Sequence, residues 1–145
     1  TSESASDKLQ FPEIMVLVDS DVWSEAFRKK GRGSAYIDRL RELIELDEVV
    51  MIGPIRQEIL SGIREKRKFE EIRELLKAFP GEPLEDSIHE LAASFFNTCR
   101  SKGIRGSHTD FLVCACGVAW KVGILSKNKD FRRYSKYVPI DLEEI

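Results

Sequence analysis

Hydrophobic residues near the start of the chain form an unbroken run over 14–18 that stops at Asp19. An apolar run of this length predicts a strand that is buried on both faces of a parallel sheet. Ligands of open α/β sheets bind at the carboxyl ends of the strands, and Asp19 would lie at that edge. The alternative is a structural role, because Asp19 or Ser20 could cap a helix that begins near Asp21. Both interpretations remain open on this pattern alone.

The rest of the chain alternates between helical and strand-like patterns. Helical spacing of apolar residues predicts helices over about 21–29, 36–44, 54–63, 69–79, 86–101 and 110–121. Short apolar runs predict strands at 48–52 and 122–125, and 137–140 is a candidate fourth strand at an edge, where Pro139 is tolerated. Strands that alternate with helices predict a parallel sheet with right-handed crossovers, and so one α/β domain.

The composition is that of a globular protein of one domain, with 145 residues, of which 42% are hydrophobic and 33% charged. The polar and acidic segment 1–10 is unlike a signal peptide and predicts a disordered lead-in, which leaves 11–145 as a single domain. No stretch reaches the roughly 18 apolar residues of a membrane span. A net charge of −2 excludes a strong overall attraction to nucleic acid, so any such binding requires a local patch.

The three cysteines, Cys99, Cys114 and Cys116, form an odd set within apolar helical segments. They predict buried free thiols in a reducing compartment, and therefore a cytoplasmic protein. Cys114 and Cys116 are too close in sequence for a zinc or redox pair.

Glu58 is the second acidic residue of interest. It follows Ile55 by three residues in the helix that Pro54 opens, so its side chain borders the apolar face of that helix. The alternative is a surface glutamate that pairs with Arg56 or a neighbouring lysine.

Asp110 is the third. Ser107 and Asp110 have the spacing of a capping box, which would need no further function. One turn later the helix carries Val113 and Cys114, so Asp110 lies above a buried stripe. An acid in that position requires a partner or a cation, because an unpaired buried charge is costly.

The third predicted strand also ends in polar residues, namely Ser126, Asn128 and Asp130. An ordinary turn is the alternative, since all three residue types favour turns. Together, however, two strand ends and two helix starts would direct oxygen ligands at one crevice. Carboxylates without histidine or cysteine suit Mg²⁺ or Mn²⁺, and their mutual repulsion favours a divalent cation among them. Metal-assisted chemistry on a phosphate group is the expected consequence.

Four segments carry a resemblance to a known family, in the order 17–23, 57–60, 110–113 and 126–131. From about residue 14 to 140 the chain resembles a PIN domain, and is most similar to the small PIN-domain ribonucleases that act as toxins of VapBC toxin–antitoxin pairs. The resemblance implies a PIN-like three-layer α/β/α domain with a central, mostly parallel sheet of four or five strands. It also implies an endoribonuclease dependent on Mg²⁺ or Mn²⁺ that leaves 5′-phosphate and 3′-hydroxyl ends, commonly homodimeric and silenced by a cognate antitoxin.

The resemblance assigns roles to particular positions. The metal-binding and catalytic acids would be Asp19, Glu58, Asp110 and Asp130. Ser126 falls where the family has a threonine or serine near the metal. Asn128 stands where many members carry another aspartate, which leaves open whether one ion binds or two.

RNA contact requires positive charge near this site. Basic residues cluster after the third predicted strand: Lys127, Lys129, Arg132, Arg133 and Lys136. They predict a patch for RNA phosphates, with a solvated turn as the alternative. The basic residues at 28–32 could extend this patch, whereas we interpret the charged segment 64–73 as a solvent-exposed face.

Two other functions compete with a toxin ribonuclease. Asp19 and Asp21 have the spacing of a haloacid-dehalogenase-like phosphatase, in which Asp19 would be a nucleophile, although the chain is short for one. A PIN protein outside toxin pairs, acting in RNA processing or as a non-catalytic binding scaffold, is the second alternative, and Asn128 favours it.

Overall fold

A computed structural model describes residues 14–29 and 33–145, so the predicted lead-in over 1–10 lies outside the described residues. Three strands form a sheet of order β2-β1-β3, with β1 at Val16–Val18, β2 at Val49–Val50 and β3 at Gly123–Leu125. Both pairings are parallel. The central strand β1 is completely buried, as its unbroken apolar run predicts.

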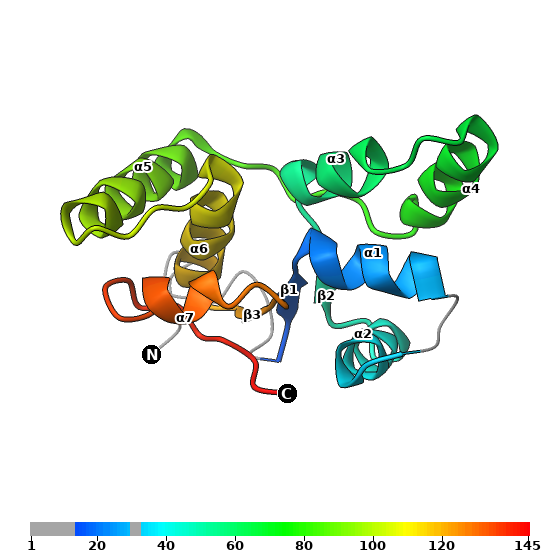
Figure 1. The fold of residues 1–145 in the computed structure, drawn as a ribbon, viewed down its shortest axis with the longest axis horizontal. Helices are drawn as coiled ribbons and strands as arrows, with labels where there is room; N and C mark the ends of the chain where they lie inside the picture. Colours follow the sequence, from blue (N-terminus) through cyan, green and yellow to red (C-terminus); the bar gives the residue numbers. More distant parts are fainter. Residues whose placement is uncertain (1–13, 30–32) are drawn as a thin grey trace, which may run out of the picture.

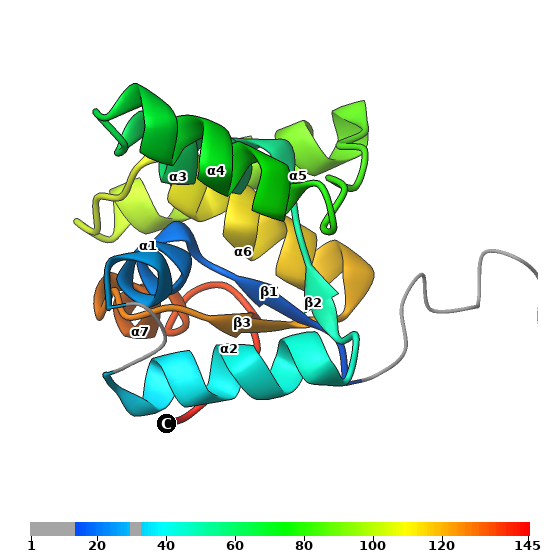
Figure 2. The same ribbon diagram turned by 90° about the vertical axis from the view of Figure 1, so that its right-hand side faces the viewer.

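Seven helices connect and cover the strands in the described part of the chain. Their bounds are α1 Ser20–Lys29, α2 Ala35–Glu45, α3 Gly53–Ser61, α4 Lys66–Leu76, α5 Asp86–Ser101, α6 His108–Trp120 and α7 Asp130–Tyr134. In space, α1 lies between α2 and α3 (Figure 1). Figure 2 shows α2 on one side of the sheet and α6 on the other, which is the three-layer α/β/α arrangement.

The sheet has fewer strands than expected. Within the described residues it contains three, and the candidate strand at 137–140 is absent. Pro139 has no N–H group to donate, and the N–H groups of Tyr137 and Val138 both donate to the carbonyl of Tyr134 at 2.9 Å, which closes the turn after α7. Isolated parallel bridges instead extend the two edges, from Ile52 to Glu82 and from Ile124 to Leu142.

Helix α6 is the main core helix, with seven buried residues. All three cysteines are free and buried, which confirms the prediction from their apolar surroundings. Burial raises the pKa of the Cys116 thiol to about 12, so this group stays protonated and unreactive. None of the described helices combines the length and the apolar character needed to cross a bilayer.

Candidate active site

A cleft of about 700 Å³ opens where β1 and β3 end and where α1 and α6 begin, with one face of α3 along its side. We call it the acidic cleft, because four carboxylates line it: Asp19, Asp21, Glu58 and Asp110. They come from three separate parts of the chain and meet because parallel strands end at the same edge of a sheet. The structure therefore brings together three of the four acids expected from the sequence. Asp21 also lines the cleft, although the sequence did not predict it to be a metal ligand.

Asp19 is the most buried of these acids, with only 7% of the residue exposed. One carboxylate oxygen accepts a hydrogen bond from the Ser20 N–H at 2.8 Å, and the other accepts one from the Ser126 hydroxyl at 2.7 Å. Burial, followed by the negative charge of Asp21, raises the pKa of Asp19 from its ordinary value of 3.8 to about 7. An anionic Asp19 is therefore costly in the protein alone, and a nearby cation would stabilise it.

Asp21 lies in the first turn of α1 and faces the loop that follows β3. The Lys127 N–H donates to both of its carboxylate oxygens, at 3.1 and 3.3 Å. Burial raises the pKa of Asp21, while the Lys127 N–H acts in the opposite direction. Its i, i+2 spacing from Asp19 was the available sequence signal, and it was interpreted only as a phosphatase pattern.

Ser126 and Asn128 order the loop that follows β3, as residue types that favour turns commonly do. Their place near a metal ion stays a prediction. The Ser126 hydroxyl donates to Asp19 and accepts from the Asn128 N–H at 3.0 Å. The Asn128 side-chain oxygen accepts from the Asp130 N–H at 2.9 Å, which shapes the start of α7. Asn128 also lines the acidic cleft.

Glu58 is an exposed residue of α3 that lines the cleft. Its Oε1 accepts a hydrogen bond from the Ser20 hydroxyl at 2.8 Å, which directs the carboxylate towards the start of α1. Arg56, the partner expected in the alternative interpretation, donates instead to the carbonyls of Leu76 and Phe79 at the end of α4. The predicted surface pair with Arg56 is therefore wrong.

Asp110 lies in the first turn of α6, where its N–H donates to the Ser107 hydroxyl at 3.0 Å, so Ser107 caps the helix as predicted. The Asp110 carboxylate also accepts a side-chain hydrogen bond that the sequence did not predict. The hydroxyl of Tyr134, a completely buried residue of α7, donates to Asp110 Oδ2 at 2.6 Å. Burial and the neighbouring Asp110 raise the pKa of Tyr134, which keeps it a proton donor.

Replacing Tyr134 with phenylalanine should lower the free energy of unfolding by about 1.5–3 kcal/mol, the range for a hydrogen bond to a charged group. The ring and its packing are retained, so only the hydroxyl contact with Asp110 is lost. Urea unfolding measures the change, and the slope of unfolding free energy against urea should not alter. An unchanged midpoint would show that water replaces the Tyr134 hydroxyl at no cost.

Asp130 is not brought into the cleft. It is the first residue of α7, its side chain is 46% exposed, and its carboxylate lies 3.8 Å from Arg133 one turn further on. Asp130 is not among the residues that line the cleft. We therefore revise the expected set of acids, with Asp21 lining the cleft in place of Asp130.

The basic residues after β3 are also placed differently from the expectation. The Lys127 ammonium group forms an ion pair with Glu25, which is only 8% exposed and also accepts from the Ser34 hydroxyl. Arg133 lies beside Asp130. A separate hollow is lined by Lys127, Lys129 and Arg132 together with the acidic residues Glu143 and Glu144. Much of the positive charge expected for RNA is thus opposed by nearby carboxylates.

The donors of the cleft are all oxygens, which suits a hard divalent cation. As the side chains stand, no three acidic, histidine or cysteine residues in the described part of the chain converge closely enough to hold an ion. Glu58 and Asp110 instead accept hydrogen bonds from Ser20 and Tyr134. The exposed Glu58 is the acid that can turn into the cleft most readily.

The chain is also similar in sequence to known proteins. The profile of the PIN domain family matches residues 16–137. A VapC ribonuclease of Mycobacterium bovis is 29% identical over 120 residues, which cover 81% of this chain and 89% of the relative. Ribonuclease VapC11 of Mycobacterium tuberculosis shows the same identity and coverage.

Solved structures resemble the fold. A chain of VapBC2 from Rickettsia felis, in a crystal structure with a DNA fragment from the promoter, superposes with a TM-score of 0.72 at 15% identity, covering 90% of this chain and 98% of that chain. A chain of FitAcB from Neisseria gonorrhoeae gives a TM-score of 0.71 at 15% identity, with 90% and 97% covered. At these identities the likeness concerns the fold alone.

Proposed function

Because the chain belongs to the PIN domain family, we propose that it is an endoribonuclease that hydrolyses phosphodiester bonds with the help of Mg²⁺ or Mn²⁺. The observation that carries this proposal is the buried carboxylate of Asp19, with a pKa of about 7, in a cleft lined by three further acids. Such an arrangement is unfavourable in the protein alone and becomes favourable with a cation.

Asp19, Glu58 and Asp110 are the residues that would hold the ion, and Asp21 is close enough to Asp19 to raise its pKa. When bound, a divalent cation supplies a Lewis acid that activates water and offsets the charge that develops on the phosphodiester. Ser126 and the Ser20 N–H orient both oxygens of Asp19, while Tyr134 fixes one oxygen of Asp110. These outer contacts leave few orientations open to the carboxylates, which is the role of supporting residues around metal ligands.

A phosphatase of the haloacid dehalogenase type is disfavoured. Its nucleophile would be Asp19, but the lysine and the paired acidic motif that such an enzyme carries after later strands have no convincing match in this chain. The family match also points away from that enzyme class.

We further propose that the chain is the toxin of a VapBC pair, cytoplasmic and homodimeric, with a cognate antitoxin as its partner. Support comes from the curated relatives, which are named VapC ribonucleases, and from the fold shared with chains of VapBC complexes. Expression of the chain in bacteria should arrest growth, and Asp110→Asn should remove that effect.

Cleavage of labelled single-stranded RNA tests the enzyme proposal. We expect cuts with 5′-phosphate and 3′-hydroxyl ends in Mn²⁺ or Mg²⁺ and none with EDTA. Glu58→Gln should lower the rate by at least about tenfold, since even outer partners of metal ligands typically matter at that level. Glu70→Gln, an exposed glutamate of α4 paired with Arg73, is the matched control and should cleave normally.

The second candidate function is a non-catalytic PIN scaffold. Two observations favour it: Asn128 at the cleft, and the absence among the described residues of three converging ligands. Thermal unfolding with Mn²⁺ separates the two, because a ligand that binds only the folded protein raises its stability. A nuclease should show a midpoint that rises with millimolar Mn²⁺, and an unchanged midpoint would support the scaffold.

A further inference from the structure

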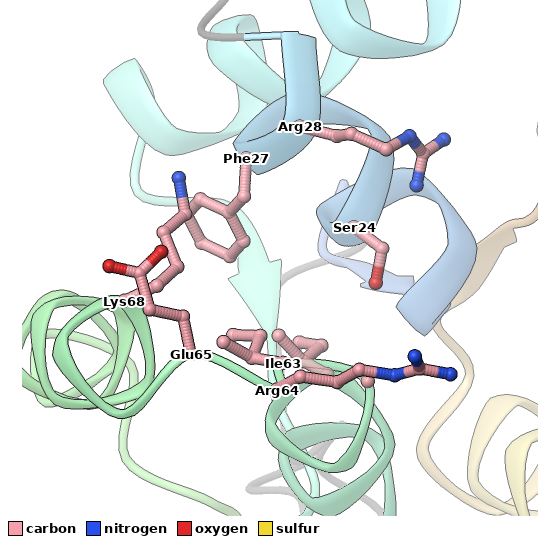
Figure 3. A pocket seen from close by; sticks show the side chains of 9 residues that line it. Ser24, Phe27, Arg28, Ile63, Arg64, Glu65 and Lys68 are labelled. Atoms are coloured by element: carbon pink, nitrogen blue, oxygen red, sulfur yellow. The ribbon is translucent and has the colours of Figure 1, made fainter.

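A groove of about 550 Å³ lies between α1, α3 and α4 (Figure 3). Its lining is both basic and apolar: Ser24, Phe27, Arg28, Ile59, Gly62, Ile63, Arg64, Glu65 and Lys68. We propose that this basic groove is the track along which single-stranded RNA runs next to the acidic cleft. The proposal rests on the ribonuclease function above. It adds a substrate-binding site between α1, α3 and α4 that the sequence did not predict.

The basic groove and the acidic cleft are neighbours, because Gly62 lines both. The shared helix α1 gives Asp21 to the cleft and gives Ser24 and Arg28 to the groove. These three residues are spaced i, i+3 and i+7, so they follow one face of the helix. At 1.5 Å per residue, Arg28 lies about 10 Å along the axis from Asp21. A strand whose phosphate is at the cleft could therefore continue into the groove.

The charge of the groove suits phosphates. Arg28, Arg64 and Lys68 face a single acidic lining residue, Glu65. None of these three cations forms an ion pair within 4 Å with an acid in the described part of the chain, whereas Lys127 is paired with Glu25. Arg28 lies near enough to Glu25 to add, after Lys127 and Ser34, to the lowering of the pKa of Glu25. Figure 3 shows the guanidinium groups of Arg28 and Arg64 extending to the same side of the groove, while Glu65 and Lys68 lie on the other. The two arginines are thus the main candidates for phosphate contacts.

The apolar part of the groove suits bases. Phe27 is half-buried, and its ring points into the groove above Ile63 (Figure 3). The Phe27 ring stacks on the ring of Trp23, with the ring centroids 6.0 Å apart and an interplanar angle of 27°. Proteins that bind single-stranded nucleic acid combine cations along the backbone with aromatic faces for the bases. The sequence suggested only a solvent-exposed face for 64–73, because α3 and α4 place Arg64 and Lys68 opposite α1 only after folding.

The walls of the acidic cleft themselves repel the phosphates that flank the reacting one. A substrate with several phosphates therefore requires positive charge close by. The segment after β3 also adjoins the cleft, because Asn128 lines both, but it offers less free charge. Lys127 is paired with Glu25, Arg133 lies beside Asp130, and the hollow that holds Lys129 and Arg132 also holds the acidic Glu144. Adjacency and unpaired charge together favour RNA in the basic groove over an acidic protein segment.

Binding of a labelled uridine-rich RNA of about 12 nucleotides tests the proposal. The measurement uses the Asp19→Asn background in EDTA, so that the RNA stays intact. Adding Arg28→Gln and Arg64→Gln should weaken binding about tenfold and reduce the slope of log affinity against log salt by about 1.4, at about 0.7 per phosphate contact. Phe27→Leu should weaken binding severalfold without changing the slope.

A matched pair, Lys129→Gln with Arg132→Gln, removes the same charge from the other surface and should have a clearly smaller effect. If both pairs weaken binding equally, the effect is one of overall charge and the proposal is overturned. If the arginine pair changes neither affinity nor slope, the RNA assignment is also overturned, and an acidic protein segment becomes the occupant that the charge fits.

Cleavage separates this proposal from the function on which it rests. In an otherwise wild-type chain, the arginine pair should lose about tenfold in the rate on the longer RNA and clearly less on an RNA of about three nucleotides, which is too short to fill the groove. Equal losses on both lengths would overturn the groove. Absence of cutting by the wild-type chain would instead overturn the ribonuclease, while the binding result still decides whether the groove holds RNA.

Discussion

Asp19→Asn is expected to abolish metal-dependent RNA cleavage while making the metal-free protein more stable at pH 8. The loss of activity should be about 10²–10³-fold or more, the size typical for loss of one group that stabilises transition-state charge. The gain in stability follows from burial, which raises the pKa of Asp19 from 3.8 to about 7. Between these values the folded protein binds more protons than the unfolded chain, so its stability falls as the pH rises.

A shift of this size corresponds to about 4 kcal/mol at most, lost between about pH 4 and pH 7. The neutral amide avoids that loss, so we expect Asp19→Asn to be more stable by about 2–4 kcal/mol at pH 8 in EDTA, with little difference near pH 4. The hydrogen bonds can be kept: the Ser20 N–H can still donate to the amide oxygen, and Ser126 can turn its hydrogen towards Asp21, 3.5 Å away.

Urea unfolding across this pH range, with and without Mn²⁺, provides the measurement. Asp38→Asn, an exposed carboxylate of α2, is the control and should change neither stability nor cleavage. If Asp19→Asn is less stable than the wild type at pH 8, the inference that the charge of Asp19 destabilises the metal-free protein is contradicted. A variant that still cleaves RNA would remove Asp19 from the catalytic set.

Gly106→Ala should cost about 2–4 kcal/mol of folding free energy, through overpacking of a full core and loss of a buried hydrogen bond. A methyl group at this position would lie 2.2 Å from the Tyr134 hydroxyl, 2.7 Å from its Cζ and 2.9 Å from Phe111 Cε2. Tyr134 is completely buried and bonded to Asp110, so it cannot move aside without releasing that carboxylate. The variant should also bind Mn²⁺ more weakly.

Two further variants define the cause. Gly53→Ala should be close to neutral, because no atom lies within 4 Å of the added methyl group. Combining Gly106→Ala with Tyr134→Phe should recover part of the loss, since the nearest obstructing atom is the hydroxyl oxygen. If the two changes simply add, the steric explanation is incorrect.

Predictions from the sequence were most accurate where a single property, such as an unbroken apolar run, determines the local structure. The buried run before Asp19 defines β1, and its polar end places that acid at the sheet edge. The helices were predicted because their periodicity extends over many residues, whereas α7 has only five and was missed. Pro139 was taken as tolerable in an edge strand, but the turn closed by Tyr134 determined the conformation there.

Contacts between distant residues were harder to anticipate. The bond from Tyr134 to Asp110 joins residues 24 apart and depends on the missing side chain of Gly106. The position of Asp130 depended on the unpredicted helix α7, and the pairing of Lys127 depended on Glu25 facing the loop after β3. In each case the residue type was visible in the sequence, but its direction was set by packing.

The pairing of β1 with β3 has a consequence for synthesis of the chain. Asp19 and Ser126, which share a hydrogen bond, are separated by 107 positions, and Tyr134 comes later still. Contacts between such distant segments cannot form until both have been made. A nascent chain on the ribosome therefore carries its first acids long before it can arrange them, and a product terminated before residue 126 would lack the hydroxyl groups that hold Asp19 and Asp110.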